Sequence, residues 1–324
     1  MEVNVELLIQ SGNQVFSPIV QEGITWTTER KGCPGELQFK VVKDDVVSDI
    51  GFQEGDAVRL KVNGSEVFYG FIFKKKRSKD QIISVTAYDQ LRYLKNKDTY
   101  VYENKTAGEF IRMIATDFQL QTGSIEDTKF KISSRIEENT SLFDMIQNAL
   151  DLTLENQKKI YIMYDDFGKI TLKSLENMQV NVLIDEETGE NFDYTSSIDD
   201  QTYNKVKLTY DNEETGKREV YIAQHGGNIN EWGVLQHFDT LKEGENGQAK
   251  ADALLSLYNA KTRNLSINNA IGDTRVRAGS MVAVMLNLGD VEANTWMLVE
   301  KCKHEFKEGQ HLMNLTLRGG EFVA

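Results

Sequence analysis

The chain has 324 residues, of which 40% are hydrophobic, and its formal net charge at pH 7 is −13. At roughly 150 residues per domain this length fits about two or three domains, and the apolar content excludes a chain that is disordered throughout. The acidic balance also argues against non-specific nucleic-acid binding, because phosphates repel a negatively charged surface.

Residues 1–95 are expected to be mainly strands. Residues 58–62 alternate between apolar and charged side chains, which is typical of a strand with one buried face. This strand stops at Asn63-Gly64, a strong signal for a two-residue hairpin turn, and an apolar strand follows at 67–73. Short strands at this spacing predict a small β-barrel or sandwich.

Residues 96–200 predict an α/β insert. Thr106 and Glu109 fit a capping box, in which each side chain bonds the other residue's backbone amide at the start of a helix. A second helix is expected from Ser141, and a β-hairpin over residues 160–175. The acidic, polar stretch that follows, at 176–203, is interpreted as a connector.

Residues 201–324 return to strands. One helix is expected over about residues 246–262, because its apolar side chains recur at helical spacing. Strongly apolar strands are expected at 281–286 and 296–303.

The two β-rich ends share an order of features. Gly55-Asp56 and Gly279-Ser280 each place a glycine and a small polar residue before a strand, and a strongly apolar strand follows each. The pattern favours a duplicated domain, although a coincidental similarity between two β domains stays open. We therefore predict a β-rich α+β fold, in which two related small β-barrels, 1–95 and 201–324, flank the insert at 96–200.

The strands at 67–73 and 281–286 are apolar on both faces, whereas a strand that faces water on one side alternates. Their outer faces must be covered by the helix at 246–262, by the insert, or by another subunit. The basic run at 74–79 either docks an acidic partner or a phosphate backbone, or is a solvated hairpin tip. The residues that we predict at a subunit or partner interface are Tyr69, Phe71, Phe73, Met281, Ala283, Met285, Lys75, Lys76 and Arg77.

The sequence carries none of the familiar catalytic motifs, and we predict no catalytic residue, no cofactor and no metal. Cys302, His304 and His311 fit either a zinc site or a hydrogen-bonded structural histidine, and the core residues around them favour the second. The acidic run at 211–216 superficially resembles a calcium loop, but it lacks the required glutamate and is interpreted as a hairpin turn.

No stretch approaches the roughly 18 uninterrupted apolar residues of a membrane-spanning helix. Residues 1–6 lack the basic and apolar regions of a secretory signal. The two cysteines, Cys33 and Cys302, are far apart and match no disulfide framework. We therefore expect a protein that is made and folded in the cytoplasm.

Several segments resemble the XkdQ/YqbQ family of phage-like elements in Gram-positive bacteria, and the similarity runs nearly end to end. The most specific is the string Tyr-Asp-Gln-Leu-Arg-Tyr-Leu-Lys at residues 88–95. The others lie at residues 24–32, 68–73, 203–206, 232–236 and 311–315.

The resemblance implies a structural baseplate hub of a contractile phage tail, prophage or tailocin, rather than an enzyme. Such a hub is a trimeric ring with pseudo-sixfold symmetry that joins the tail tube to the spike. Its implied partners are other copies of the chain, the tail-tube protein, and spike and baseplate wedge proteins, with no specific nucleic acid and no membrane. It would assemble in the bacterial cytoplasm and end in the tail or tailocin particle.

Two other functions stay open. One is a tail-associated cell-wall hydrolase, which zymography on peptidoglycan would reveal. The other is a host-surface carbohydrate-binding module, which would need exposed aromatic platforms.

Overall fold

The computed structural model describes residues 2–42, 51–77, 79, 82–189, 191–199, 202–212, 215–241, 246–287 and 292–319. Contacts divide the chain into two compact units. The first unit combines Met1–Asp193 with Ser266–Arg318, and the second is built on Tyr194–Leu265.

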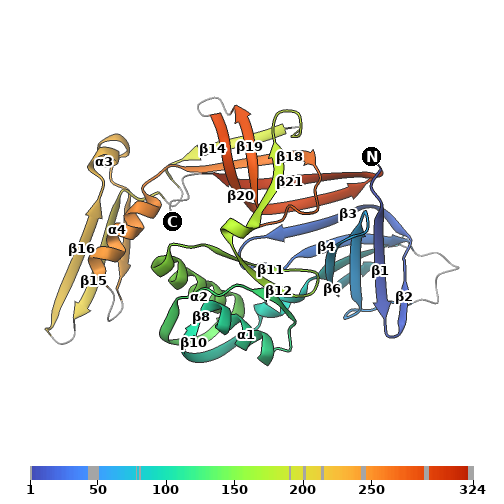
Figure 1. Ribbon diagram of the computed structural model, residues 1–324, viewed down its shortest axis with the longest axis horizontal. Helices are drawn as coiled ribbons and strands as arrows, with labels where there is room; N and C mark the ends of the chain where they lie inside the picture. Colours follow the sequence, from blue (N-terminus) through green and yellow to red (C-terminus); the bar gives the residue numbers. More distant parts are fainter. Residues whose placement is uncertain are drawn as a thin grey trace. The chain divides into compact units, whose positions relative to one another are not determined.

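A large, mostly antiparallel sheet dominates the first unit (Figure 1). Its N-terminal strands are β1 (Val5–Ser11), β2 (Gln14–Phe16), β3 (Val20–Glu29), β4 (Glu36–Val42), β5 (Ala57–Val62), β6 (Ser65–Arg77) and β7 (Ile82–Tyr88). Its later strands are β13 (Gln179–Ile184), β19 (Met281–Asn287), β20 (Glu292–Lys307) and β21 (Gln310–Gly319). The strands β14 (Asn191–Ser197) and β18 (Thr262–Ile271) carry the chain between the two units.

The first and last β-rich segments meet where β3 pairs with β20. Trp26 lies opposite His304, and Glu29 lies opposite Lys301. The strand order β21-β20-β3-β4-β7-β6-β5-β1-β2 is an open path, with β19 on β20 and β13 on β19. The β-rich class with few helices is confirmed. The described strands do not close into two barrels, so that part of the prediction stays a proposal.

The strands of residues 1–95 share this sheet with those of Ser266–Arg318, and contacts place both segments in one unit. The predicted division into three domains, with boundaries at residues 95 and 200, stays a prediction.

The two copies of the glycine motif have the same local structure. Gly55 and Gly279 both adopt a left-handed backbone, with φ of 95° and 90°. The Gly55 amide donates to Ile72 O at 2.8 Å, and the Gly279 amide donates to Val299 O at 2.7 Å. In return, the Ile72 and Val299 amides donate to the carbonyls of the residues after the two glycines, at 2.9 and 2.8 Å.

The small polar residue of each copy has a matching role. The Asp56 carboxylate accepts from the Gln53 amide at 2.7 Å, and the Ser280 hydroxyl accepts from the Arg277 amide at 3.2 Å. In both copies the side chain therefore bonds the amide three residues earlier, which closes the turn that leads into the strand.

The insert packs two helices against short strands. Its elements are η1 (Gln90–Lys95), β8 (Lys97–Thr106), α1 (Ala107–Asp117), β9 (Thr122–Ile125), β10 (Lys131–Ser141), α2 (Leu142–Gln157), β11 (Tyr161–Asp165), β12 (Ile170–Ser174) and η2 (Leu175–Met178). Phe110 and Ile114 of α1 and Met145 and Ile146 of α2 are fully buried in one core, which explains the helical spacing of these apolar residues.

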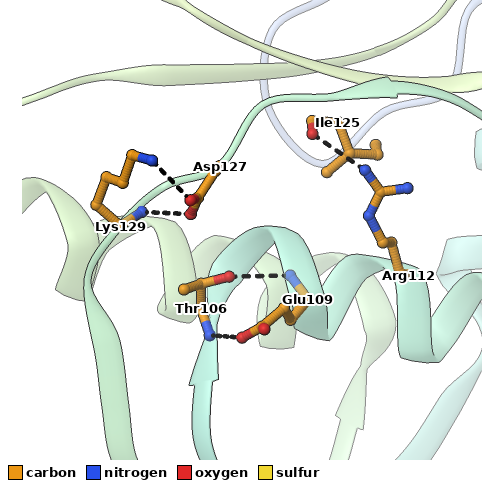
Figure 2. Close-up of polar contacts among 6 residues, drawn as sticks. All are labelled: Thr106, Glu109, Arg112, Ile125, Asp127 and Lys129. Atoms are coloured by element: carbon orange, nitrogen blue, oxygen red, sulfur yellow. Dashed lines mark hydrogen bonds and ion pairs between the residues drawn. The ribbon is translucent and has the colours of Figure 1, made fainter.

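The capping box predicted for α1 is confirmed (Figure 2). The Thr106 amide donates to the Glu109 carboxylate at 2.7 Å, and the Glu109 amide donates to the Thr106 hydroxyl at 3.2 Å. Figure 2 also shows the Arg112 guanidinium donating to Ile125 O at 3.1 Å, which ties α1 to β9. The predicted start of the second helix is confirmed as well, because Ser141 is the N-cap of α2.

Two sequence expectations need correction. The stretch at 176–203 is not only a connector, because it contains η2, β13 and β14, and β13 pairs with β19. Burial alternates along β13, because Val182 and Ile184 are less exposed than Asn181 and Leu183. This alternation was missed because the acidic residues that follow led to the whole stretch being interpreted as a connector. The helix expected at 246–262 is α4 (Gly247–Tyr258), so it ends earlier.

The second unit is a three-stranded sheet with one helix against it (Figure 1). Its elements are β15 (Lys205–Asn212), β16 (Lys217–Gln224), α3 (Gly226–Trp232), β17 (Gln236–Thr240) and α4. Val206, Leu208 and Ala223 of the sheet form a small core with Ala251 of α4. The acidic run at 211–216 leads from β15 into β16, but residues 213 and 214 lie outside the described residues.

Candidate functional site

Three aromatic residues predicted at an interface, Tyr69, Phe71 and Phe73, lie on the outer face of β6 and are half-buried. The Tyr93 ring of η1 lies 6.3 Å from Phe71 and 5.9 Å from Phe73, and Phe167 lies 5.8 Å from Tyr69, measured between ring centroids. The chain therefore covers part of this face itself, through η1 and the β11–β12 turn. Contact of these residues with another subunit stays a prediction.

Gly168 allows the β11–β12 turn to approach β6. Its φ is +84°, and a side chain built there would collide with the Tyr69 ring. The Gly168 amide donates to the Asp165 carboxylate at 2.7 Å, which fixes the turn. The turn at residues 166–168 thus has a packing role that its sequence alone did not reveal.

The basic run is divided between buried and exposed side chains. Lys75 is largely buried, because its ammonium donates to Phe52 O at 2.5 Å and lies 3.5 Å from the Glu54 carboxylate. Lys76 and Arg77 are exposed at the end of β6. Of the predicted contact residues Lys75, Lys76 and Arg77, only Lys76 and Arg77 therefore have a charged group exposed for contact with a partner.

The strand β19 shows a different pattern. Val282 and Val284 are buried on its inner face. On its outer face, exposure increases along the strand: Met281 is buried, Ala283 is half-buried and Met285 is 52% exposed. The sequence therefore correctly marked a strand that is apolar on both faces. Contact with a partner remains a prediction here too.

Neighbouring strands extend this face. Ala283 lies opposite Trp296 on β20 and beside Leu183 on β13. Trp296 is 38% exposed and Leu183 is 44% exposed. Leu183, Ala283, Met285 and Trp296 therefore form one apolar surface, which we call the β19 face. Leu183 was missed because it lies in the stretch that was interpreted as a connector.

A buried polar junction joins three distant parts of the sequence. Asp89 accepts hydrogen bonds from the amides of Gly35 and Leu91, at 2.8 and 3.0 Å. Burial raises the pKa of Asp89 well above its usual range, and the charge of Asp165 adds to this effect. Burial also raises the pKa of Asp165 to about 6, although the Gly168 amide and Arg277 act in the opposite direction.

The third member of this junction is Arg277, which precedes β19. Its guanidinium lies 4.4 Å from the centroid of Tyr164 and 5.6 Å from that of Trp26. Asp165 Oδ2 and Arg277 Nε have no hydrogen-bond partner among the described residues. Two carboxyl groups thus share one nearby cation, so ionising both is unfavourable. Nothing in the sequence, in which acids are abundant, singled out this pair.

The histidine cluster is a hydrogen-bonded part of the core, as the sequence favoured. The His304 ring is fully buried, with Nδ1 2.8 Å from His311 Nε2 and Nε2 2.9 Å from Val276 O. It stacks on Trp26, with 4.8 Å between ring centroids. Burial lowers the pKa of His304 to about 3 and that of His311 to about 4, so both rings are neutral at pH 7.

The described residues contain no group of three or more His, Cys, Asp or Glu side chains placed to hold a metal ion. A polar groove crosses β3, β4 and β20 and includes Cys33, Lys95 and Lys301. Burial raises the pKa of the Cys33 thiol, and Glu29 adds to this, so Cys33 is a weak nucleophile at pH 7. In the part of the chain that the structure covers, no helix has the length and apolarity needed to cross a membrane.

Comparisons with known proteins agree on one group. A family model described as YQBQ-like matches residues 24–318. The chain is 32% identical over 309 residues to the YqbQ protein of Bacillus subtilis (strain 168), and 31% identical over 309 residues to the phage-like element PBSX protein XkdQ of the same organism. Each alignment covers 92% of this chain and 92% of the relative.

Among solved structures, the fold is similar to that of the 43 kDa tail protein of prophage MuSo2 from Shewanella oneidensis. The TM-score is 0.74 at 12% sequence identity, and the match covers 98% of this chain and all of that protein. At this identity the likeness concerns the fold.

Proposed function

The chain belongs to the YQBQ-like family, and from that premise we propose that it is a structural hub subunit of a contractile, phage-type tail baseplate. In this proposal three copies form a ring that joins the tail tube to the spike, and the chain has no enzymatic activity of its own. The names of the PBSX relative and of the MuSo2 tail protein support the assignment to a phage-like tail.

The observation that carries the hub role is the duplicated turn at Gly55 and Gly279. The same hydrogen bonds lead into β5 and β19, and each strand then pairs with a strongly apolar neighbour, β6 or β20. A chain with two copies of one β unit presents six such units in a trimer. A ring of this kind would match a sixfold tube on one side and a threefold spike on the other.

The β19 face is the surface that we assign to contacts within the particle. It combines Met285, Trp296 and Leu183, and burial of such exposed apolar area stabilises an assembly by roughly 25 cal/mol per Å². The exposed Lys76 and Arg77 would add charge contacts to acidic partners, which include further copies of this acidic chain.

A reconstruction of the tail particle tests the proposal directly. We expect three copies of the chain on the tail axis between tube and spike, with the β19 face buried. A chain placed off the axis, or present in a number other than three, would overturn the hub role.

A further inference from the structure

The second unit has a sheet face that its own helix does not cover. The helix α4 lies against β15 and β16 (Figure 1), and its Ala251 shares a core with Val206, Leu208 and Ala223 of the sheet. Strand residues alternate between faces, so Lys205, Lys207 and their cross-strand neighbours point to the opposite side. We call this opposite side the β15 face.

Apolar side chains flank the centre of the β15 face. Lys207 lies directly opposite Ile222 on β16 and beside Phe238 on β17. Ile222 is 45% exposed, Phe238 is 56% exposed, and Val220, one step along β16, is 49% exposed. Three large apolar residues on adjoining strands are unusual for a surface that meets only water.

The charge of this face is positive, although the whole chain carries −13. Lys205 and Lys207 occupy the central strand, and the described residues give neither an ion-pair partner. Lys205 lies between Gln224 and Gln236 on the neighbouring strands, and Lys207 lies between Ile222 and Phe238. The carboxylate of Asp211, farther along the same face, is already paired with Arg218 at 2.6 Å.

We propose that the β15 face docks an acidic, amphipathic segment of a different protein chain. Apolar side chains of that segment would cover Val220, Ile222 and Phe238, and its carboxylates would meet Lys205 and Lys207. A second copy of the same face does not fit, because a symmetric contact would bring the lysines of both copies together. The inference rests on this surface alone and does not require the tail function.

Photo-crosslinking in the producing cells tests the proposal with the full chain. A photoreactive phenylalanine analogue replaces Phe238, and mass spectrometry identifies the crosslinked peptide. We expect a peptide of another protein in which Asp or Glu residues are interspersed with apolar ones. A crosslink to a second copy of this chain, or no crosslink at all, would overturn the proposal.

A charge reversal tests the electrostatic part. The double variant Lys205→Glu/Lys207→Glu should lower the crosslink yield at least tenfold, and exchanging acids for lysines in the identified segment should restore it. The matched control is Lys217→Glu/Lys261→Glu, which makes the same charge change at exposed sites off the β15 face. Undiminished crosslinking by the first double variant, with an unchanged melting temperature, would contradict the charge complementarity. Whether purified particles contain the chain is scored separately, and that result bears on the tail function only.

Discussion

Replacement of Asp165 by Asn should stabilise the protein at neutral pH. Asp165 is 5% exposed, and burial raises its pKa from 3.8 to about 6. A carboxyl group whose pKa is raised on folding binds its proton more tightly in the folded state. The free energy of unfolding therefore falls as the pH rises from about 4 to about 6, and this loss persists at pH 7.

The size of the effect follows from the shift in pKa. A rise from 3.8 to about 6 corresponds to about 3 kcal/mol at pH 7. Asn is neutral at every pH and has a carbonyl oxygen that can still accept from the Gly168 amide, so it removes the charge and keeps the turn. It also removes one cause of the raised pKa of Asp89, which acts in the same direction.

Denaturant unfolding, followed by tryptophan fluorescence at several pH values from 4 to 8, measures this difference. We expect the two proteins to be closest in stability near pH 4, and the variant to gain up to about 3 kcal/mol by pH 7. The pKa values of His304 and His311 also change on folding. Their contribution to the pH dependence of stability is the same in both proteins, so it cancels in the difference between them. The matched control is Asp193→Asn, which removes the same charge from an exposed residue outside this junction.

A variant less stable than the original protein at pH 7 would refute this reasoning. It would mean that attraction to Arg277 outweighs the cost of burying the Asp165 carboxylate. A difference independent of pH would also refute it, because the gain would then come from packing and not from ionisation.

The other predictions concern the core, the helix cap and the proposed interface. His304→Phe should lower the free energy of unfolding by about 2–4 kcal/mol, because it removes the hydrogen bonds of His304 to Val276 O and to His311; a melting temperature equal to that of the original protein would contradict this. Thr106→Ala should cost about 1 kcal/mol by removing the cap of α1, with the exposed Thr122→Ala as control in the same denaturant titration. Met285→Glu should lower the amount of chain in purified particles several-fold without changing its melting temperature, whereas the exposed Val101→Glu should not. Gly279→Ala should destabilise the fold more than Gly55→Ala. Both replacements incur the left-handed backbone cost of about 1–2 kcal/mol, but only the first also collides with Ile162; equal losses would show that the collision relaxes away.

Local features of this fold were readable from the sequence because neighbouring residues determine them. The cap at Thr106 and the turn at Asn63 and Gly64 depend on a few adjacent side chains and backbone angles. The Gly55 and Gly279 motifs were recognisable for the same reason. The pairing of β3 with β20 joins residues more than 270 positions apart, and no local pattern specifies it.

The buried junction was hidden for a related reason. Asp89, Asp165 and Arg277 look like ordinary surface charges in the sequence, which contains 50 acidic residues. What distinguishes the two acids is burial beside the half-buried Arg277, and this arises only when the ends of β7 and β11 and the segment before β19 pack together. Sequence composition therefore could not separate these three residues from their exposed counterparts.

The two strands that the sequence marked as apolar on both faces have different surroundings. The outer face of β6 is partly covered by Tyr93 and by Phe167, which reaches it because Gly168 leaves space for the Tyr69 ring. The outer face of β19 has no such cover at Met285, among the described residues. The strand β6 belongs to the first copy of the duplicated motif and β19 to the second, so η1 and the β11–β12 turn cover part of the first copy only. The second copy keeps an apolar surface at Met285, which is why the proposed contacts with other subunits centre on β19 rather than on β6.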